Sequence, residues 1–231
     1  MKKFITLPAL LALIITSVAH AQTWTEGTNY FRIVPAQHTN VDPGKIEVAE
    51  VFSYGCPFCA QINPLIQQLR KSLPANAQMV FVPASFIPAE AWPMFQRATC
   101  TAQTLGIFEK TNDAMFDAVW KTGELAISDP TTHALKRRMP TIEDAAGYYN
   151  HISGIAVDKF LAAAKSFSVD AAMRRYDGLV LAYQVDGTPS LIVNGKYRVT
   201  GQSAGGLVQM LELTKWLVAK EAKESVKSLS R

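Results

Sequence analysis

The sequence holds few of the residues from which a metal centre is built. Its 231 residues include three cysteines and four scattered histidines, and Cys100 is the only cysteine outside the pair Cys56 and Cys59. A closed zinc site on that pair would need two more ligands, and there is no second Cys-x-x-Cys and no His-x-x-x-His. Zinc is therefore the less favoured interpretation of the pair, and we expect no metal and no cofactor. For Cys100 we expect the role of a buried, apolar filler.

A strong charge of either sign is also missing. The chain has 23 basic and 19 acidic residues, and 21 basic residues remain without Lys2 and Lys3. This balance does not favour binding to nucleic acid, and the run Lys136-Arg137-Arg138 is more typical of a solvated helix face.

Long hydrophobic runs are absent beyond the N-terminus. Residues 1–21 comprise two lysines, an apolar stretch over residues 4–18 and the small-x-small sequence Ala19-His20-Ala21, which predicts a cleavable signal peptide. The alternative, an uncleaved membrane anchor, is disfavoured because a spanning helix needs about 20 apolar residues. Export of this kind indicates a periplasmic or extracellular, oxidising compartment.

Cys56 and Cys59 lie between a predicted strand and a predicted helix. A β-favouring run over residues 46–54 precedes them, and a helix-like segment over residues 60–73 follows. Cys56 then lies at the first helical turn, where unpaired N–H groups and the helix dipole favour thiolate over thiol. Pro57 suits the first helical position because its missing N–H would be unpaired anyway. Because Cys59 is one turn further along, the pattern predicts a redox dithiol. A purely structural disulfide would close too small a loop to restrict the unfolded chain much.

Glu50 is unusual inside the predicted strand over residues 46–54, where the surrounding residues are those of a buried strand. One interpretation is that this face of the strand is partly exposed. The other is that Glu50 holds a carboxyl beneath the cysteines, where it takes up or passes on the proton of Cys59.

The rest of the chain divides into α/β and helical regions. Further strands are expected over residues 30–34, 78–85, 191–193 and 196–199, the last two joined by Asn194-Gly195, a strong hairpin signal. Helices are expected over residues 91–105, 108–120, 141–151 (with Thr141 and Asp144 as a capping box), 157–167, 169–184 (capped by Ser168) and 204–220, followed by a frayed tail. We therefore predict an inserted helical domain over residues 88–170. Residues 22–87 and 171–231 would form a discontinuous α/β domain.

Several motifs together resemble a known family. Cys56-Pro57-Phe58-Cys59 with Pro64, and Thr188-Pro189 entering a hairpin strand, resemble the thioredoxin superfamily. The helical insertion, the export signal, Glu50 six residues before Cys56, and the run Pro-Ser-Leu-Ile-Val-Asn-Gly-Lys-Tyr resemble the DsbA thiol:disulfide interchange proteins. The resemblance extends over nearly all of the chain after residue 21.

The resemblance implies a thioredoxin-like fold, a central mixed sheet flanked by helices, with an inserted all-helical subdomain. It implies that Pro189 is cis and lies against the cysteines, although cis is a minority outcome for an X–Pro bond on sequence alone. It also implies that the backbone at Thr188 pairs with an extended substrate. The Cys56–Cys59 disulfide would then oxidise reduced or unfolded exported proteins in the periplasm, and a DsbB-type membrane partner would restore it. We expect a monomer, with Cys56 exposed and Cys59 buried.

Two features depart from the family pattern. The best-known DsbA dipeptide between the cysteines is Pro-His, whereas Phe58 here offers no cation or donor to the thiolate. The lysine that accompanies the buried glutamate in some relatives has no counterpart in Met79-Val80-Phe81-Val82. We therefore predict a higher Cys56 pKa than with histidine, and an ion pair at Glu50 is in doubt.

Two other functions remain open on the sequence. A periplasmic disulfide isomerase or reductase fits Thr188 before Pro189 about as well. A peptide-binding chaperone, in which the cysteines are incidental, is the alternative from a different class of protein.

Overall fold

The computed structural model describes residues 23–229 of the chain. The predicted signal peptide, residues 1–21, therefore lies outside the described residues. Within them, none of the helices combines the length and the apolar composition that crossing a membrane requires.

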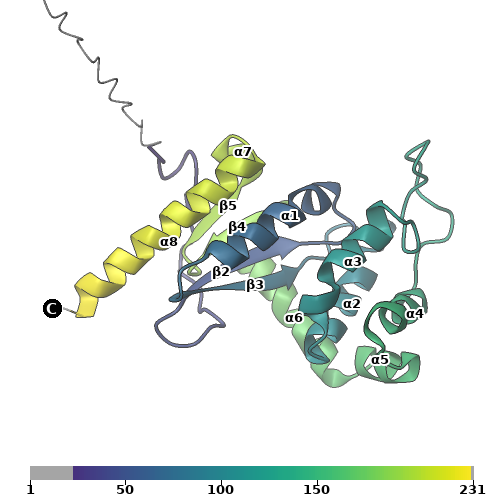
Figure 1. Ribbon diagram of the computed structural model, residues 1–231. Coiled ribbons are helices and arrows are strands. Elements are labelled where there is room, and N and C mark those ends of the chain that lie inside the picture. Colours follow the sequence, from purple (N-terminus) through teal and green to yellow (C-terminus); the bar gives the residue numbers. More distant parts are fainter. Residues whose placement is uncertain (1–22, 230–231) are drawn as a thin grey trace, which may run out of the picture.

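Five strands form one mixed sheet in the order β1-β5-β4-β2-β3 (Figure 1). Their bounds are β1 Phe31–Arg32, β2 Ile46–Phe52, β3 Ala77–Pro83, β4 Ser190–Val193 and β5 Tyr197–Thr200. Strands β2 and β3 are parallel, and the remaining pairs are antiparallel. All seven residues of β2 are buried because this strand lies inside the sheet with helices on both faces. The predicted mixed sheet is confirmed.

Helices cover the two faces of the sheet. Helix α1 (Pro57–Ser72), which continues through Pro64, and helix α8 (Leu207–Leu229) bury apolar side chains against one face. Helix α6 (Phe167–Ala182) covers the other face, where Val180 and Tyr183 pack with Ala49, Val51 and Ile192. The alternation of apolar side chains along β2 thus supplies both layers of the core.

The helical region lies beyond the β3 edge of the sheet (Figure 1). It contains η1 Pro88–Glu90, α2 Trp92–Thr104, α3 Phe108–Trp120, α4 Ile142–Ser153 and α5 Val157–Ala164. The predicted capping box at the start of α4 is present, since Thr141 and Asp144 exchange hydrogen bonds between side chain and backbone. Helix α6 runs without a break across residues 170 and 171, where the predicted domain boundary lies.

Two local predictions were wrong. The cap of α6 is Ser166, whose hydroxyl accepts a hydrogen bond from the Val169 N–H, and not Ser168. The tail after residue 220 continues as helix α8 to Leu229. It is held because the buried carboxylate of Glu221 accepts hydrogen bonds from Asn194 and Lys196, each at 2.6 Å.

Candidate active site

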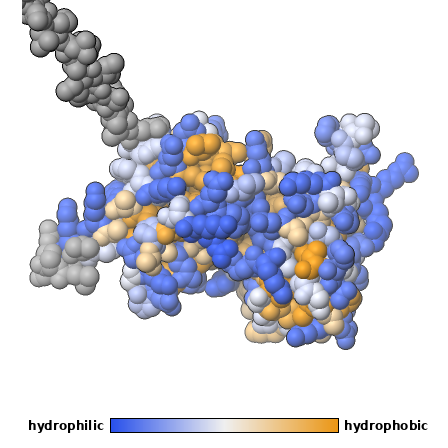
Figure 2. All heavy atoms as spheres, viewed as in Figure 1, coloured by the Kyte–Doolittle hydropathy of each residue, from blue (hydrophilic) through white to orange (hydrophobic). Residues whose placement is uncertain are grey.

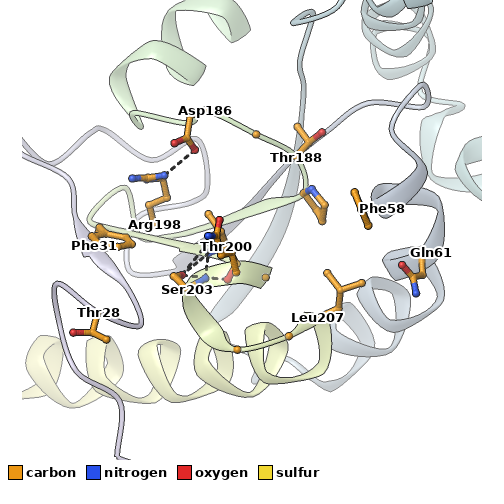
Figure 3. Close-up of a pocket in the computed structure, with 16 residues that line it drawn as sticks. Thr28, Phe31, Phe58, Gln61, Asp186, Thr188, Arg198, Thr200, Ser203 and Leu207 are labelled. Carbon is orange, nitrogen blue, oxygen red and sulfur yellow. Dashed lines mark hydrogen bonds and ion pairs between the residues drawn. The ribbon is translucent and has the colours of Figure 1, made fainter.

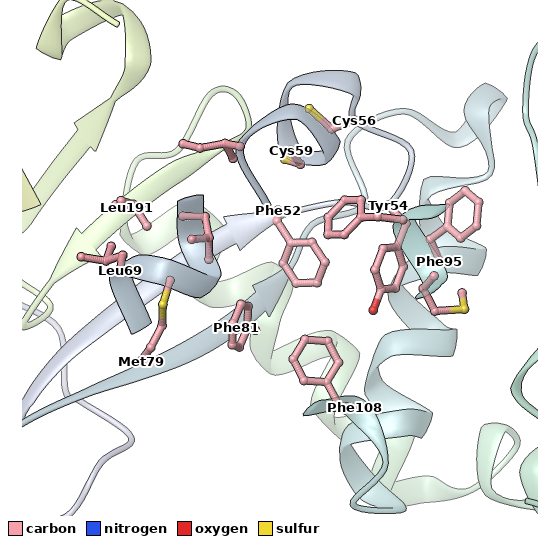
Figure 4. Packing of buried hydrophobic residues seen from close by; sticks show 14 of the residues in the cluster. Phe52, Tyr54, Cys56, Cys59, Leu69, Met79, Phe81, Phe95, Phe108 and Leu191 are labelled. Atoms are coloured by element: carbon pink, nitrogen blue, oxygen red, sulfur yellow. The ribbon is translucent and has the colours of Figure 1, made fainter. Parts of the chain in front are cut away.

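The sharp turn between β2 and α1 places the cysteine pair. Cys56 is the N-cap of α1, with extended backbone angles, and Pro57 occupies the first turn, as predicted. Gly55 permits this turn to pack closely, because a Cβ there would lie 2.6 Å from the Trp92 indole nitrogen. The pair therefore lies at the N-terminal end of α1, with Cys59 one turn into the helix (Figure 4).

The two sulfurs differ in their surroundings, but less in exposure than we expected. Cys59 is fully buried, as predicted, whereas the prediction of an exposed Cys56 was wrong: only 4% of its surface is accessible. A distant segment contributes to this burial. The Cys56 thiol donates a hydrogen bond of 3.3 Å to the Thr188 carbonyl, so the loop before β4 lies against the sulfur.

That loop holds the proline which the family resemblance singled out. The Thr188–Pro189 peptide bond is cis, and Pro189 directly precedes β4. The resemblance implied this geometry, whereas local sequence favoured trans. The contact between Cys56 and Thr188 joins two segments 132 residues apart in the chain.

The surroundings of Cys56 stabilise its anion. The pKa of Cys56 is lowered to about 6, first because the Cys59 thiol donates a hydrogen bond to it. Burial opposes this shift, and the Thr188 side chain and the backbone N–H groups of Cys59 and Phe58 support it. The Thr188 hydroxyl is buried and has no hydrogen-bond partner among the described residues, so it is free to serve a thiolate. The pKa of Cys59 is raised, first by burial and then by the neighbouring Cys56.

Glu50 lies in the interior beneath the pair. It is only 2% exposed, so the interpretation as a partly exposed strand face was wrong. Burial raises the pKa of Glu50 to about 8, and the negative charge of Cys56 contributes to this shift. Its neighbours across the sheet are Phe81 and Leu191, both apolar, so no lysine replaces the missing ion-pair partner on these strands. The carboxyl is therefore largely protonated near neutral pH.

A groove of about 1110 Å³ opens beside the pair (Figure 3). Phe58 and Gln61 of α1 line one side, and Thr188 and Pro189 line the next. The rest of the lining comes from Thr28, Phe31, Asp186, Gly187, Arg198 and the residues from Thr200 to Ser203 and from Gly205 to Leu207. Figure 2 shows hydrophobic surface near α7 (Gly201–Ala204), at this end of the molecule, and Phe58 is 60% exposed.

The structure brings together the cysteines and the Thr188-Pro189 loop, which the sequence singled out, but the sequence analysis missed most of the groove. Its far side comes from the segment between β5 and α8, which is rich in glycine and small polar residues. The Gly205-Gly206 pair was the one local signal for a surface where backbone is accessible. Among the described residues, no three His, Cys, Asp or Glu side chains are grouped to hold a metal ion.

The chain is similar to known proteins over most of its length. The family model described as DSBA-like thioredoxin domain matches residues 47–210. The thiol:disulfide interchange protein DsbA of Pseudomonas aeruginosa is 33% identical over 220 residues, which cover 93% of this chain and 95% of the relative. DsbA of Azotobacter vinelandii is 34% identical over 84% of this chain and 83% of its own length.

Solved structures agree. The crystal structure of Pseudomonas aeruginosa DsbA has a TM-score of 0.74 and 32% identity over 87% of this chain and 96% of that one. The oxidoreductase DsbA from Xylella fastidiosa has a TM-score of 0.73 and 28% identity over 84% of this chain and 95% of that one. The fold, the cysteine pair beside a cis-proline and these matches together show that the chain belongs to the DsbA family of thioredoxin-like proteins.

Proposed function

We propose that Cys56 and Cys59 form the redox-active disulfide of a thiol:disulfide oxidoreductase that oxidises reduced, newly exported proteins. The observation that carries this proposal is the asymmetry of the two sulfurs. The pKa of Cys56 lies near 6 at the start of α1, whereas the pKa of the buried Cys59 is raised. Lowering the energy of the Cys56 thiolate stabilises the reduced protein, which makes the disulfide form an oxidant. DsbA is itself the established example of an oxidant of this kind.

The reaction runs through two thiol–disulfide exchanges. A substrate thiolate attacks the Cys56 sulfur, forms a mixed disulfide and expels Cys59, which takes up a proton because its thiolate is disfavoured by burial. A second substrate thiolate attacks the substrate sulfur of the mixed disulfide and expels the Cys56 thiolate. The substrate loses two electrons and gains a disulfide, and the Cys56–Cys59 pair accepts them. The low pKa of Cys56 makes it the better leaving group in this second step.

Thr188 and Pro189 position the substrate in this proposal. The Thr188 carbonyl already lies 3.3 Å from the Cys56 sulfur, so an extended substrate pairing with this backbone brings its own sulfur to Cys56. The groove beside the loop then accommodates the flanking residues of the substrate. Phe58 adds an exposed apolar surface at the entrance.

Glu50 supplies the proton that the departing Cys59 needs. Its carboxyl is buried, carries a proton at neutral pH, and interacts electrostatically with both sulfurs. A group whose pKa is near the working pH both gives and regains a proton readily.

The cellular setting follows from the same assignment. We propose that the chain is exported to the periplasm by its predicted signal peptide, residues 1–21, and acts there as a monomer. A membrane-bound partner of the DsbB type would reoxidise the pair. We propose no nucleic acid as a partner and no cofactor beyond the disulfide.

The first experiment follows oxidation of a reduced cysteine-pair peptide by the oxidised protein. We expect Cys56→Ser to abolish the reaction. Cys59→Ser is assayed separately with a single-cysteine peptide whose sulfur is held in a disulfide with a small thiol. The Cys56 thiolate attacks the peptide sulfur and the small thiolate leaves, so we expect a disulfide between Cys56 and the peptide to accumulate because no Cys59 sulfur is present to resolve it. The matched control is Cys100→Ala, which removes a fully buried thiol whose pKa is raised to about 12 and should leave the rate unchanged. Oxidation that persists in Cys56→Ser contradicts the proposal, and peptide binding without any oxidation by the wild-type protein would favour a chaperone.

The second experiment replaces Phe58 by histidine. An imidazolium within a few ångströms of a thiolate lowers the thiol pKa by roughly one unit or more. We therefore expect the Cys56 pKa, read from the ultraviolet absorbance of the thiolate, to fall in Phe58→His and to stay near the wild-type value in Phe58→Leu. An unchanged pKa in Phe58→His rejects this explanation of the dipeptide.

The third experiment tests Glu50 through the pH dependence of stability, in the oxidised protein. A carboxyl with a pKa of 4.5 when unfolded and about 8 when folded keeps its proton only in the folded state between these values. The free energy of unfolding therefore falls as pH rises from about 5 to 8. We expect Glu50→Gln to gain on the order of 2–3 kcal/mol over wild type across this range in urea unfolding. Burial is the larger cause of the raised Glu50 pKa, and forming the Cys56–Cys59 disulfide does not remove this burial. Parallel pH profiles of the two proteins would show that Glu50 is not a buried acid.

The proton role of Glu50 has its own readout. We expect Glu50→Gln to slow the single-turnover reduction of the disulfide by a substrate thiol by roughly 10²-fold. If Cys59 is released at the same rate in Glu50→Gln as in the wild-type protein, Glu50 has no role in the reaction.

A further inference from the structure

The groove beside the cysteine pair carries one cation whose charge is incompletely neutralised. Of the residues that line the groove, only Asp186 and Arg198 are charged. The Arg198 side chain is 15% exposed, and its Nε is buried with no hydrogen-bond partner among the described residues. A buried donor without an acceptor has lost its hydration without a replacement.

Packing holds this guanidinium in place. Its central carbon lies over the Phe31 ring, 5.2 Å from the ring centre, so the aromatic ring attracts the cation. Arg198 belongs to β5 and pairs in register with Ile192 of β4 and Phe31 of β1, which fixes its backbone between two strands. The cation is therefore positioned before any ligand arrives.

The present partner of Arg198 is weakly held. Asp186 accepts a hydrogen bond of 3.1 Å from Nη1, but its side chain is 84% exposed. Ion pairs with so exposed a partner contribute little to stability because water and salt screen them. Another carboxylate can replace Asp186, or share the guanidinium with it, at small cost.

We propose that Arg198 is a specificity residue that binds a carboxylate of the substrate chain, so that the protein prefers peptides with an acidic residue near the reactive cysteine. A planar guanidinium suits this role because it binds carboxylates through parallel hydrogen bonds. The inference depends on the proposed function in one respect: it takes the ligand that carries the carboxylate to be a substrate of the oxidoreductase. Figure 3 shows Arg198 and Asp186 on the side of the groove opposite Phe58.

Strand geometry sets the distance from the reactive sulfur. Arg198 lies one strand over and two residues along from Ser190, which follows the cis-proline and pairs with Thr200. By the spacing of strands and residues this is roughly 8 Å between backbones. An extended peptide spans this distance in about two to three residues. If the peptide runs from Cys56 toward β5, the proposed carboxylate therefore lies about two to four residues from the cysteine.

The experiment compares peptide pairs that differ only in one Glu or Gln, placed two, three or four residues from the cysteine on either side. Dissociation constants are measured on versions with serine in place of cysteine, so that binding is scored apart from redox chemistry. We expect one Glu position to bind roughly tenfold more tightly than its Gln counterpart. Arg198→Gln should abolish the preference. Asp186→Asn should enlarge it by a few-fold, since it removes the competing carboxylate.

Arg138→Gln is the matched control, because it removes one positive charge from an exposed site that pairs with Asp144, far along the chain from the groove residues. It should leave the preference unchanged. Equal affinities at every position, or a preference that survives Arg198→Gln or disappears in Arg138→Gln, overturn the proposal. A weaker affinity for Glu peptides in Asp186→Asn also overturns it, and this variant changes only an exposed side chain.

Oxidation rates of the cysteine versions separate the two proposals. Gln and Glu peptides that are oxidised equally well leave the proposed function standing and refute the role of Arg198. If neither peptide is oxidised while Glu peptides bind more tightly, the proposed function fails and the carboxylate site remains.

Discussion

The arrangement of the site depends on the energetic difference between two sulfurs one helical turn apart. Cys56 lies at the N-terminus of α1 and Cys59 inside it, so the N–H groups at the helix start serve only the first sulfur. The buried Cys59 thiol keeps its proton and donates a hydrogen bond to the Cys56 anion. One helix terminus thus makes one sulfur a good nucleophile and leaving group and the other a poor anion.

The remainder of the fold keeps this difference in place. The turn that carries Cys56 is anchored by β2, every residue of which is buried between α6 on one face and α1 with α8 on the other. The Thr188–Pro189 loop comes from β4, the antiparallel neighbour of β2, so the sheet brings a distant peptide group to the sulfur. The apolar neighbours of Glu50 in the sheet, Phe81 on β3 and Leu191 on β4, keep its carboxyl protonated near the pair. Strands β2, β3 and β4 therefore serve both the scaffold and the chemistry.

Features set by neighbouring residues were predictable from the sequence. Pro57 in the first turn of α1, the capping box at Thr141 and the hairpin at Asn194-Gly195, where both φ angles are positive, depend on a few adjacent residues. Features that depend on distant segments were not. Thr188, 132 residues away, contributes to the low exposure of Cys56. The length of α8 depends on Glu221, which reaches Asn194 and Lys196 of the β4–β5 turn. The position of Arg198 beside Asp186 likewise emerges only once β5 is packed.

The central claim is that the folded protein stabilises the Cys56 thiolate. A thiol whose pKa falls from 9 to about 6 on folding contributes stability that is fully present above pH 9 and is lost as pH falls through 6. The direct measurement is the free energy of unfolding of the reduced and oxidised forms between pH 6 and 8, in Glu50→Gln so that this carboxyl does not titrate. The reduced form should gain about 2 kcal/mol relative to the oxidised form across that range. A difference independent of pH, or one that shrinks as pH rises, would contradict the account.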